Sequence, residues 1–152
     1  MRIGLAALAN EARREALPNI ERMLPAARDA SVKVVHCLVQ RRPDGVGGNH
    51  NAKIFAIGDG SGSEIAITPG APGAELLPEL GPIATDLVLR RRHGIGRGTN
   101  LDAVNKAYRV VLPRNAVAGI PTDYANTVID NMLSLLATIT TTDKLIEVWK
   151  QP

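Results

Sequence analysis

Residues 86–104 read DLVLRRRHGIGRGTNLDAV, and they hold the parts of one strand–loop–helix unit. The aliphatic run inside 86–91 predicts a strand. The glycines that follow predict a flexible loop, and Thr99 or Asn100 is placed to cap a helix over 101–107. A strand that leads through a short loop into a helix is typical of a parallel α/β sheet.

Similar patterns lie on both sides of this unit. Pro18 suits the first turn of a helix over 18–30, which Pro25 should kink. The strand expected next, at 32–39, looks apolar on both faces, which favours a strand covered on both sides. The remaining expected elements are a helix over 51–57, an extended piece at 65–68, a helical turn at 74–77, a strand at 110–112, a helix over 122–136, a strand at 138–141 and a helix over 142–149. We expect Thr122 to cap the helix over 122–136. The buried face of that helix should consist of Val128, Met132, Leu135 and Leu136.

Helices and strands therefore alternate, which predicts an α/β fold with a mainly parallel sheet and helices on both faces. The length of 152 residues fits one domain over residues 1–152. Aromatic residues make up only 3% of the chain, so we expect an aliphatic core.

Composition argues against several function classes. The net charge is +3, but few aromatic residues accompany the arginines, so we expect no nucleic-acid partner. No apolar run approaches the roughly 18 residues that a membrane span needs, so we expect no membrane partner. Cys37 is the only cysteine, which rules out a disulfide within the chain. Together these features predict a cytoplasmic protein.

An arginine cluster follows the strand expected at 86–91. Arg90, Arg91 and Arg92 stand at its end, and His93 comes next. Ligands of open parallel sheets bind outside the carboxyl ends of the strands, and an arginine there can hold a carboxylate or phosphate through two hydrogen bonds. The alternative is a solvated strand end with one arginine in a salt bridge. The glycine spacing at 94–98 matches neither the dinucleotide fingerprint nor the P-loop.

Cys37 and His36 are neighbours on the first expected strand. Adjacent strand residues point to opposite faces, so they cannot act as a nucleophile and its base. We expect Cys37 to be an inert core residue. His36, His50 and His93 lack the spacing of a metal site, so we predict no metal and no cofactor.

The chain resembles one family through the order of five stretches, and no single motif is decisive. They are LPNIERMLPAARDASVKVVHCLVQRRPDG at 17–45, NHNAKIFAI at 49–57, PGAPGAELLPELGP at 69–82, DLVLRRRHGIGRGTNLDAV at 86–104 and YRVVLPRNAVAGIPTDYANTVIDNMLSLLATITTTDKL at 108–145. The chain resembles the isochorismatase-like cysteine hydrolases, the group with the nicotinamidases and N-carbamoylsarcosine amidases.

That resemblance implies a three-layer α/β fold and hydrolysis of carbon–nitrogen bonds in small amides. The family uses Asp, Lys and Cys, and the cysteine attacks the carbonyl carbon. It also implies a small amide or carboxylate as the bound molecule, and a homo-oligomer.

The family's catalytic residues carry over only in part. Counted from Asp86, the lysine position is Arg91, and counted back from Thr99 it is Arg90. Arginine keeps the charge but does not readily share a proton. We therefore take Arg91 as the candidate catalytic residue, with Arg90, Arg91 and His93 as the candidate substrate-binding residues.

The aspartate and the cysteine of the family have no counterpart that we can place. Residues 1–9 offer no strand that ends in Asp, and no strand fits between Val104 and Tyr108 before the position of the cysteine. A superficial match would put Ala125 where the cysteine stands, but its flanking residues align with a later part of the family. The two missing strands would lie side by side in the middle of the sheet.

We therefore expect a hydrolase-like protein with impaired or no activity. The alternatives are a non-enzymatic scaffold for self-association or small-anion binding, and a truncated or internally deleted product without a function. Without central strands, the remaining strands must close the gap, borrow strands from another subunit, or leave unpaired edges in a marginally stable fold.

Overall fold

The computed structural model describes residues 5–44, 46, 67–91 and 100–151. Of these, 5–32 and 100–151 form one compact unit, and the described residues between 33 and 91 form a second. One domain over 1–152 stays a prediction. No helix of the described part is long and apolar enough to span a membrane.

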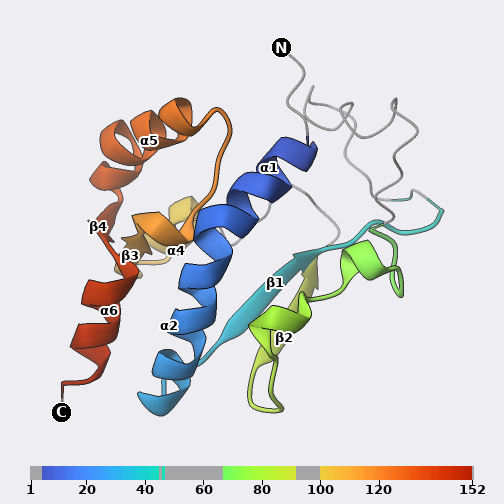
Figure 1. The fold of residues 1–152 in the computed structure, drawn as a ribbon, viewed down its shortest axis with the longest axis horizontal. Helices are drawn as coiled ribbons and strands as arrows, with labels where there is room; N and C mark the ends of the chain where they lie inside the picture. The colour runs from blue at the N-terminus through green and yellow to red at the C-terminus, as the bar shows by residue number, and fades with distance from the viewer. Residues whose placement is uncertain (1–4, 45, 47–66, 92–99, 152) are drawn as a thin grey trace. The chain divides into compact units, whose positions relative to one another are not determined.

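The first unit begins with one continuous helical segment (Figure 1). It consists of α1 (Leu5–Glu11), a π-helical turn η1 (Ala12–Ala16) and α2 (Leu17–Asp29). The helix predicted to begin at Pro18 therefore begins thirteen residues earlier. The π turn explains how it passes Pro18: Leu17 N–H donates to the carbonyl of Ala12, five residues back, and this wider turn relieves the clash of a proline ring with the preceding turn.

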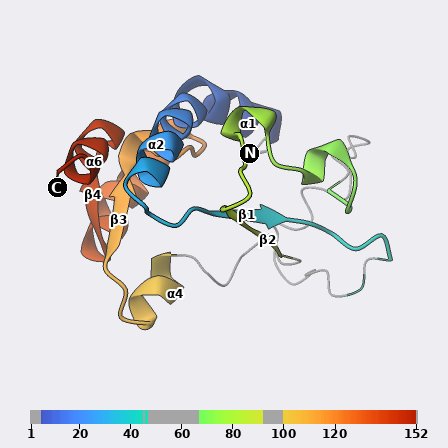
Figure 2. The same ribbon diagram turned by 90° about the horizontal axis from the view of Figure 1, so that it is seen from below.

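The second half of this unit contains one parallel strand pair and three α-helices. Its elements are α4 (Asn100–Asn105), β3 (Val110–Pro113), η4 (Arg114–Ala116), α5 (Thr122–Asn131), η5 (Leu133–Leu135), β4 (Ala137–Thr140) and α6 (Thr142–Trp149). β3 and β4 run side by side (Figure 2), with Val110 opposite Ala137 and Pro113 opposite Thr140. The predicted strands at 110–112 and 138–141 and the helix over 142–149 are confirmed.

The helix predicted over 122–136 is shorter than expected. α5 ends at Asn131, and Pro121 rather than Thr122 occupies the N-cap position. The chain leaves the helical path at Met132, whose φ is −115°. Met132 and Leu135 are therefore 45% and 81% exposed instead of lining a buried face, and Ile129 takes that role at 4%.

A polar network centred on Asn115 joins three segments of this unit. The Asn115 side-chain oxygen accepts hydrogen bonds from the backbone N–H of Thr142 at 2.9 Å and from its hydroxyl at 3.0 Å. The Asn115 amide donates to Asn19 Oδ1, and Asn19 Nδ2 donates back to the Asn115 carbonyl, both at 3.0 Å. Thr142 is fully buried, so these bonds hold the start of α6 against η4 and α2.

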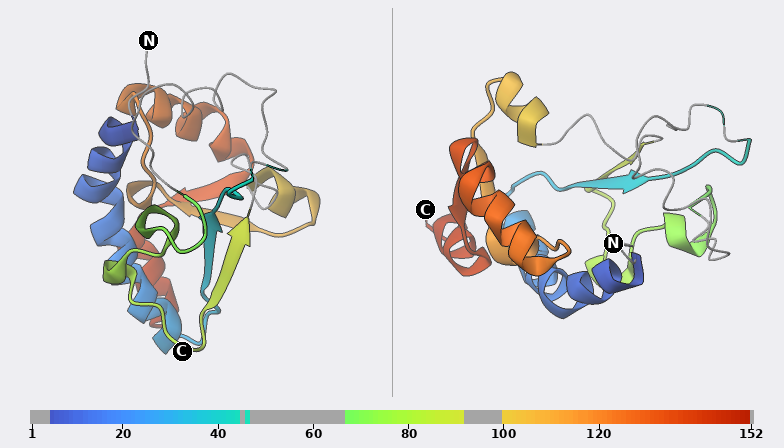
Figure 3. Two further views of the ribbon diagram at one scale, coloured as in Figure 1. Left: turned by 90° about the vertical axis from the view of Figure 1, so that its right-hand side faces the viewer. Right: turned by 90° about the horizontal axis from the view of Figure 1, so that it is seen from above.

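The second unit is built on the strand pair β1 (Val35–Val39) and β2 (Leu87–Arg91). Figure 3 shows them as neighbouring arrows that point the same way, and Val35 lies opposite Leu87. Both strands were predicted. The helical turn predicted at 74–77 is displaced, because two 3₁₀ turns, η2 (Pro72–Ala74) and η3 (Pro78–Leu80), each begin at a proline. The helix predicted over 51–57 lies outside the described residues, as does the first half of the extended piece predicted at 65–68; Ile67 and Thr68 are described and belong to no strand.

The prediction that the first strand is covered on both sides is wrong. His36 is 8% exposed on one face, but Val35 is 45% exposed on the other, where its register partner Leu87 is 54% exposed and Leu89 is 51% exposed. Alternation along a strand separates these two faces. The segments predicted as strands, 32–39 and 86–91, are apolar in sequence, but an apolar sequence does not say which face of a strand is buried.

The α/β class and the parallel pairing are confirmed, but the described strands form two sheets of two strands rather than one. No strand of the described part pairs with both sheets.

The Asn115 network generates a stability prediction. Asn115→Ala leaves the N–H and hydroxyl of buried Thr142 without their acceptor, so we expect the free energy of unfolding to fall by about 2–3 kcal/mol. Urea unfolding followed by circular dichroism measures this loss. Asn105→Ala at the exposed end of α4 is the matched control, with an expected change of about 0.5 kcal/mol or less. Equal losses in both variants would contradict the role of Asn115.

Candidate functional site

The first candidate site lies at the carboxyl end of the β1–β2 pair. Gln40, Arg41, Arg42, Pro69 and Arg90 line a pocket of about 280 Å³, which we call the arginine pocket. Residues 40–42 directly follow β1, and Arg90 is opposite Leu38 near the end of β2. Parallel strands end at the same edge, which is why residues about 50 positions apart in sequence meet here.

Carboxylates contact the guanidinium groups of Arg90 and Arg42. Arg90 Nη2 lies 3.3 Å from Glu75 Oε2, and both side chains are about half exposed. Arg42 pairs with Asp44, and this hydrogen-bonded carboxylate raises the pKa of the Arg42 guanidinium. Gln40 is only 6% exposed, and its amide donates to the Ala74 carbonyl at 3.4 Å. Three guanidinium groups beside a buried amide suit an anion with further polar groups.

The outcome differs among the predicted binding residues. Arg90 lines the pocket. Arg91 is the last residue of β2, opposite Val39, but its side chain is outside the part that the structure describes. His93 also lies outside the described residues. The sequence analysis missed Gln40, Arg41 and Arg42, although the rule that selected Arg90 applies equally to residues that follow the strand at 32–39.

Cys37 and His36 point to opposite faces of β1, as predicted, but Cys37 is not a core residue. Its thiol is exposed, because the face of the sheet that it shares with Val35 is open. His36 is buried, and its Nε2 lies 3.1 Å from Asp86 Oδ2. Asp86 also accepts the Ile83 N–H at 3.2 Å, so this pair fastens β1 to the start of β2. Cys37 lines neither of the two pockets described here.

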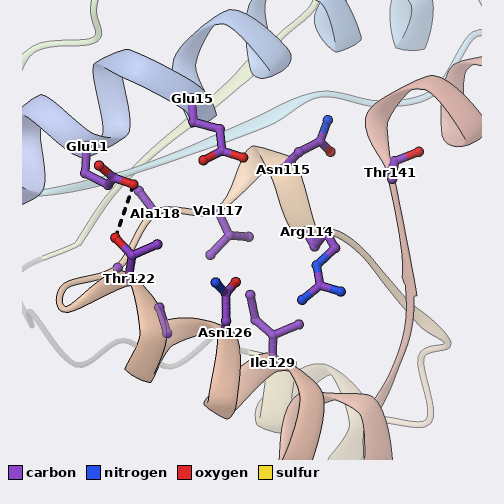
Figure 4. Close-up of a pocket in the computed structure, with 12 residues that line it drawn as sticks. Glu11, Glu15, Arg114, Asn115, Val117, Ala118, Thr122, Asn126, Ile129 and Thr141 are labelled. Carbon is purple, nitrogen blue, oxygen red and sulfur yellow. Dashed lines mark hydrogen bonds between the residues drawn. The ribbon is translucent and has the colours of Figure 1, made fainter.

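A second pocket, which the sequence analysis missed, lies at the carboxyl end of the β3–β4 pair. We call it the α5 pocket; it has a volume of about 260 Å³ and is shown in Figure 4. Its lining residues come from the helical segment at 5–29, the ends of β3 and β4, and α5. They are Glu11, Glu15, Arg114, Asn115, Val117, Ala118, Gly119, Thr122, Ala125, Asn126, Ile129 and Thr141.

Charged groups of both signs enter the α5 pocket. Glu11 is paired with Arg14 at 2.8 Å and accepts a hydrogen bond from the Thr122 hydroxyl at 3.3 Å. The hydrogen bonds from Arg14, above all, lower the pKa of the Glu11 carboxyl. Arg114 Nη2 lies 3.0 Å from Asp130 Oδ1. The pocket therefore has a carboxylate side and a guanidinium side.

Ala125 is part of this pocket. A superficial match had put this residue at the position of the family's cysteine. A Cβ atom on Gly119 would lie 2.6 Å from the Cβ of Ala125, so only glycine fits at 119 without a shift. No group of three or more metal-binding side chains occurs in the described ranges.

Comparisons with known proteins agree on one family. The sequence model of the isochorismatase domain family matches residues 2–103 of this chain. A cysteine hydrolase from Pseudomonas syringae pv. phaseolicola 1448A has a similar structure, with a TM-score of 0.75, 16% identity, and coverage of 92% of this chain and 82% of that one. For an isochorismatase family protein from Desulfovibrio vulgaris, the TM-score is 0.69 and the identity is 23%, with coverage of 90% of this chain and 85% of that one. For N-carbamoylsarcosine amidase from Thermoplasma acidophilum, the TM-score is 0.63 and the identity is 17%, with coverage of 87% of this chain and 85% of that one. No curated protein matches this chain.

The exposure of Cys37 is testable in solution. We expect the native protein to react with Ellman's reagent at a rate similar to that of the urea-unfolded protein, because the thiol is open to solvent. Cys37→Ala, which has no thiol, supplies the background. A thiol that reacts only after unfolding would show that Cys37 is covered in the native state.

Proposed function

Because this chain belongs to the isochorismatase domain family, we propose that it is a hydrolase-like member that binds a small carboxylate or amide without hydrolysing it. The proposed binding site is the arginine pocket. The observation that carries the proposal is the gathering of three arginines and a buried glutamine at the carboxyl end of β1 and β2. That edge is where parallel sheets bind their ligands.

The loss of hydrolysis is supported by an interruption inside the chain. The family match ends at residue 103. The next residues, up to Tyr108, are too few to hold the strand that the resemblance implies. There α4 is followed by a tight turn in which Tyr108 N–H donates to the Ala103 carbonyl, and β3 begins at Val110. The resemblance requires a strand and then the cysteine at this point. Structural similarity to the relatives nevertheless covers 87–92% of the chain, which supports a fold that continues on both sides of the proposed interruption.

The residues of the arginine pocket also favour binding over catalysis. Neither a cysteine nor a carboxylate is among its lining residues. Nucleophilic hydrolysis of an amide needs a nucleophile and a base within hydrogen-bond reach of each other. Arginine at the family's lysine position stays protonated, so it can hold an anion but is a poor proton carrier. The pocket thus has the groups for recognition and lacks those for bond cleavage.

The proposal predicts binding without turnover. Acetate and nicotinate should bind weakly to the purified chain in an NMR titration, and Arg90→Gln should weaken that binding about tenfold or more, because a hydrogen bond to a charged group is lost. Arg109→Gln, which changes an exposed arginine outside both pockets, is the matched control.

A panel of small amides that includes nicotinamide tests the second half of the proposal. We expect no ammonia release above background from the folded chain or from Cys37→Ala. Turnover that disappears in Cys37→Ala would contradict the proposal and would place an active site around the exposed thiol. Equal binding to the Arg90→Gln and parent chains would remove the arginine pocket as the binding site.

A second candidate function, self-association, is favoured by the edge of β1 that faces away from β2. Just beyond this edge of the strand, the Arg41 N–H donates to the Ile67 carbonyl at 2.8 Å. Val34 accepts the Leu87 N–H through its carbonyl oxygen, so the even-numbered residues of this strand direct their N–H and C=O groups at β2. The odd-numbered residues Val35, Cys37 and Val39 direct theirs at the other edge, where no strand of the described part pairs with them. An unpaired edge next to an apolar face favours pairing with a second copy.

This edge predicts a concentration-dependent dimer that a single backbone change weakens. Val35→Pro removes an N–H from the open edge and leaves the β1–β2 ladder intact, so we expect at least tenfold weaker association. Val35→Thr keeps the N–H and should associate like the parent. Sedimentation velocity over about a hundredfold range of concentration measures both. A chain that stays monomeric over that range would exclude this candidate.

A further inference from the structure

We propose that the α5 pocket binds a small zwitterion, a molecule that carries one ammonium and one carboxylate group, such as a free α-amino acid. This site is separate from the arginine pocket, because all of its lining residues belong to the first unit. The argument starts from the two kinds of charge that line the pocket.

Glu15 provides the acidic side. Its carboxylate points into the pocket, and the Asn126 side chain points toward it from α5 (Figure 4). Among the described residues, Glu15 makes no ion pair, whereas Glu11 beside it is held by Arg14 and Thr122. The Glu15 carboxylate and the Asn126 amide oxygen are both acceptors, and an ammonium group with three N–H donors can use both.

Arg114 provides the basic side. Its guanidinium group extends along the wall next to Ile129. The ion pair with Asp130 uses one of its terminal nitrogens, Nη2, at 3.0 Å. A guanidinium carries five N–H donors, so Arg114 keeps donors for a carboxylate inside the pocket.

Apolar side chains form the remaining wall and limit the size of the ligand. Ile129 is 4% exposed, and Val117 and Ala125 lie beside it in the lining. The volume of about 260 Å³ is below the roughly 300–1,000 Å³ of pockets for drug-sized molecules. A ligand with a short aliphatic chain between or beside its charged groups fits these dimensions.

The two charges together exclude simpler ligands. A plain cation would be attracted to Glu15 but repelled by Arg114. A plain anion would be attracted to Arg114 but repelled by Glu15. Only a molecule with both groups satisfies both walls. This reasoning selects the zwitterion over an amine or a carboxylate of the same size.

Three probes with the same branched alkyl group test this selection: L-leucine, isopentylamine and 4-methylpentanoate. Leucine has both charges, and each of the others lacks one. We expect leucine to bind at least tenfold more tightly than either, as measured by NMR titration of the full chain. Glu15→Gln and Arg114→Gln should each weaken leucine binding about tenfold, while Glu21→Gln and Arg109→Gln, outside the pocket, leave it unchanged.

Two further variants separate this site from the arginine pocket and from general unfolding. Arg90→Gln should leave leucine binding unchanged, since Arg90 belongs to the other pocket. Circular dichroism melting curves of Glu15→Gln and Arg114→Gln should match the parent, because Glu15 is exposed and the Arg114–Asp130 pair is largely exposed.

The proposal is overturned by any of three results. Isopentylamine that binds as tightly as leucine would show a simple cation site. Leucine binding that Arg90→Gln abolishes would place it in the arginine pocket. No binding of leucine to a folded chain would show that the charged groups of the α5 pocket do not form a zwitterion site.

Discussion

In each unit two parallel strands end at one edge, and the residues that follow them must meet there. Parallel pairing has this consequence because the connection between the strands crosses over and returns to the same end. Residues 40–42 meet Arg90 beyond β1 and β2, and Arg114 meets Thr141 beyond β3 and β4. Both pockets therefore depend on strands of only four or five residues. Such short ladders need support from the segments that pack against them.

That support differs between the units. In the first, Asn115 joins α2, η4 and the start of α6 through bonds to Asn19 and to the buried Thr142. In the second, the buried pair of His36 and Asp86 fastens one strand to the beginning of the other. In both cases a polar side chain is buried only where its hydrogen bonds are made, which is the condition for burial at low cost. Within the part that the structure describes, apolar burial is modest, and only a few aliphatic side chains are less than a tenth exposed.

Membership in the isochorismatase domain family gives these observations a common reading. The described strands form two separate parallel pairs, and the family match ends at residue 103. Our proposal is that the chain lacks the central strand that precedes the nucleophile in the family. Loss of a central strand also removes the nucleophile that follows it, because the strand positions that residue. The binding groups at the ends of the outer strands do not share this dependence. A chain can therefore lose the family's chemistry and keep anion-binding arginines, as we propose for this one.

Periodicity and composition alone determined the α/β class, all four described strands and the place of Arg90 at a strand end, since these follow from local patterns of side chains. The family was identified separately, from the resemblance of five stretches taken in order. Periodicity and composition failed at the start of the first helix, because a π turn lets the chain pass Pro18, and at Cys37, whose exposure depends on what covers a face of the sheet. The α5 pocket was beyond sequence reasoning altogether. Glu15 lies far from Arg114 and Asn126 in sequence, and only the packing of the first helical segment near η4 and α5 brings these side chains to one cavity.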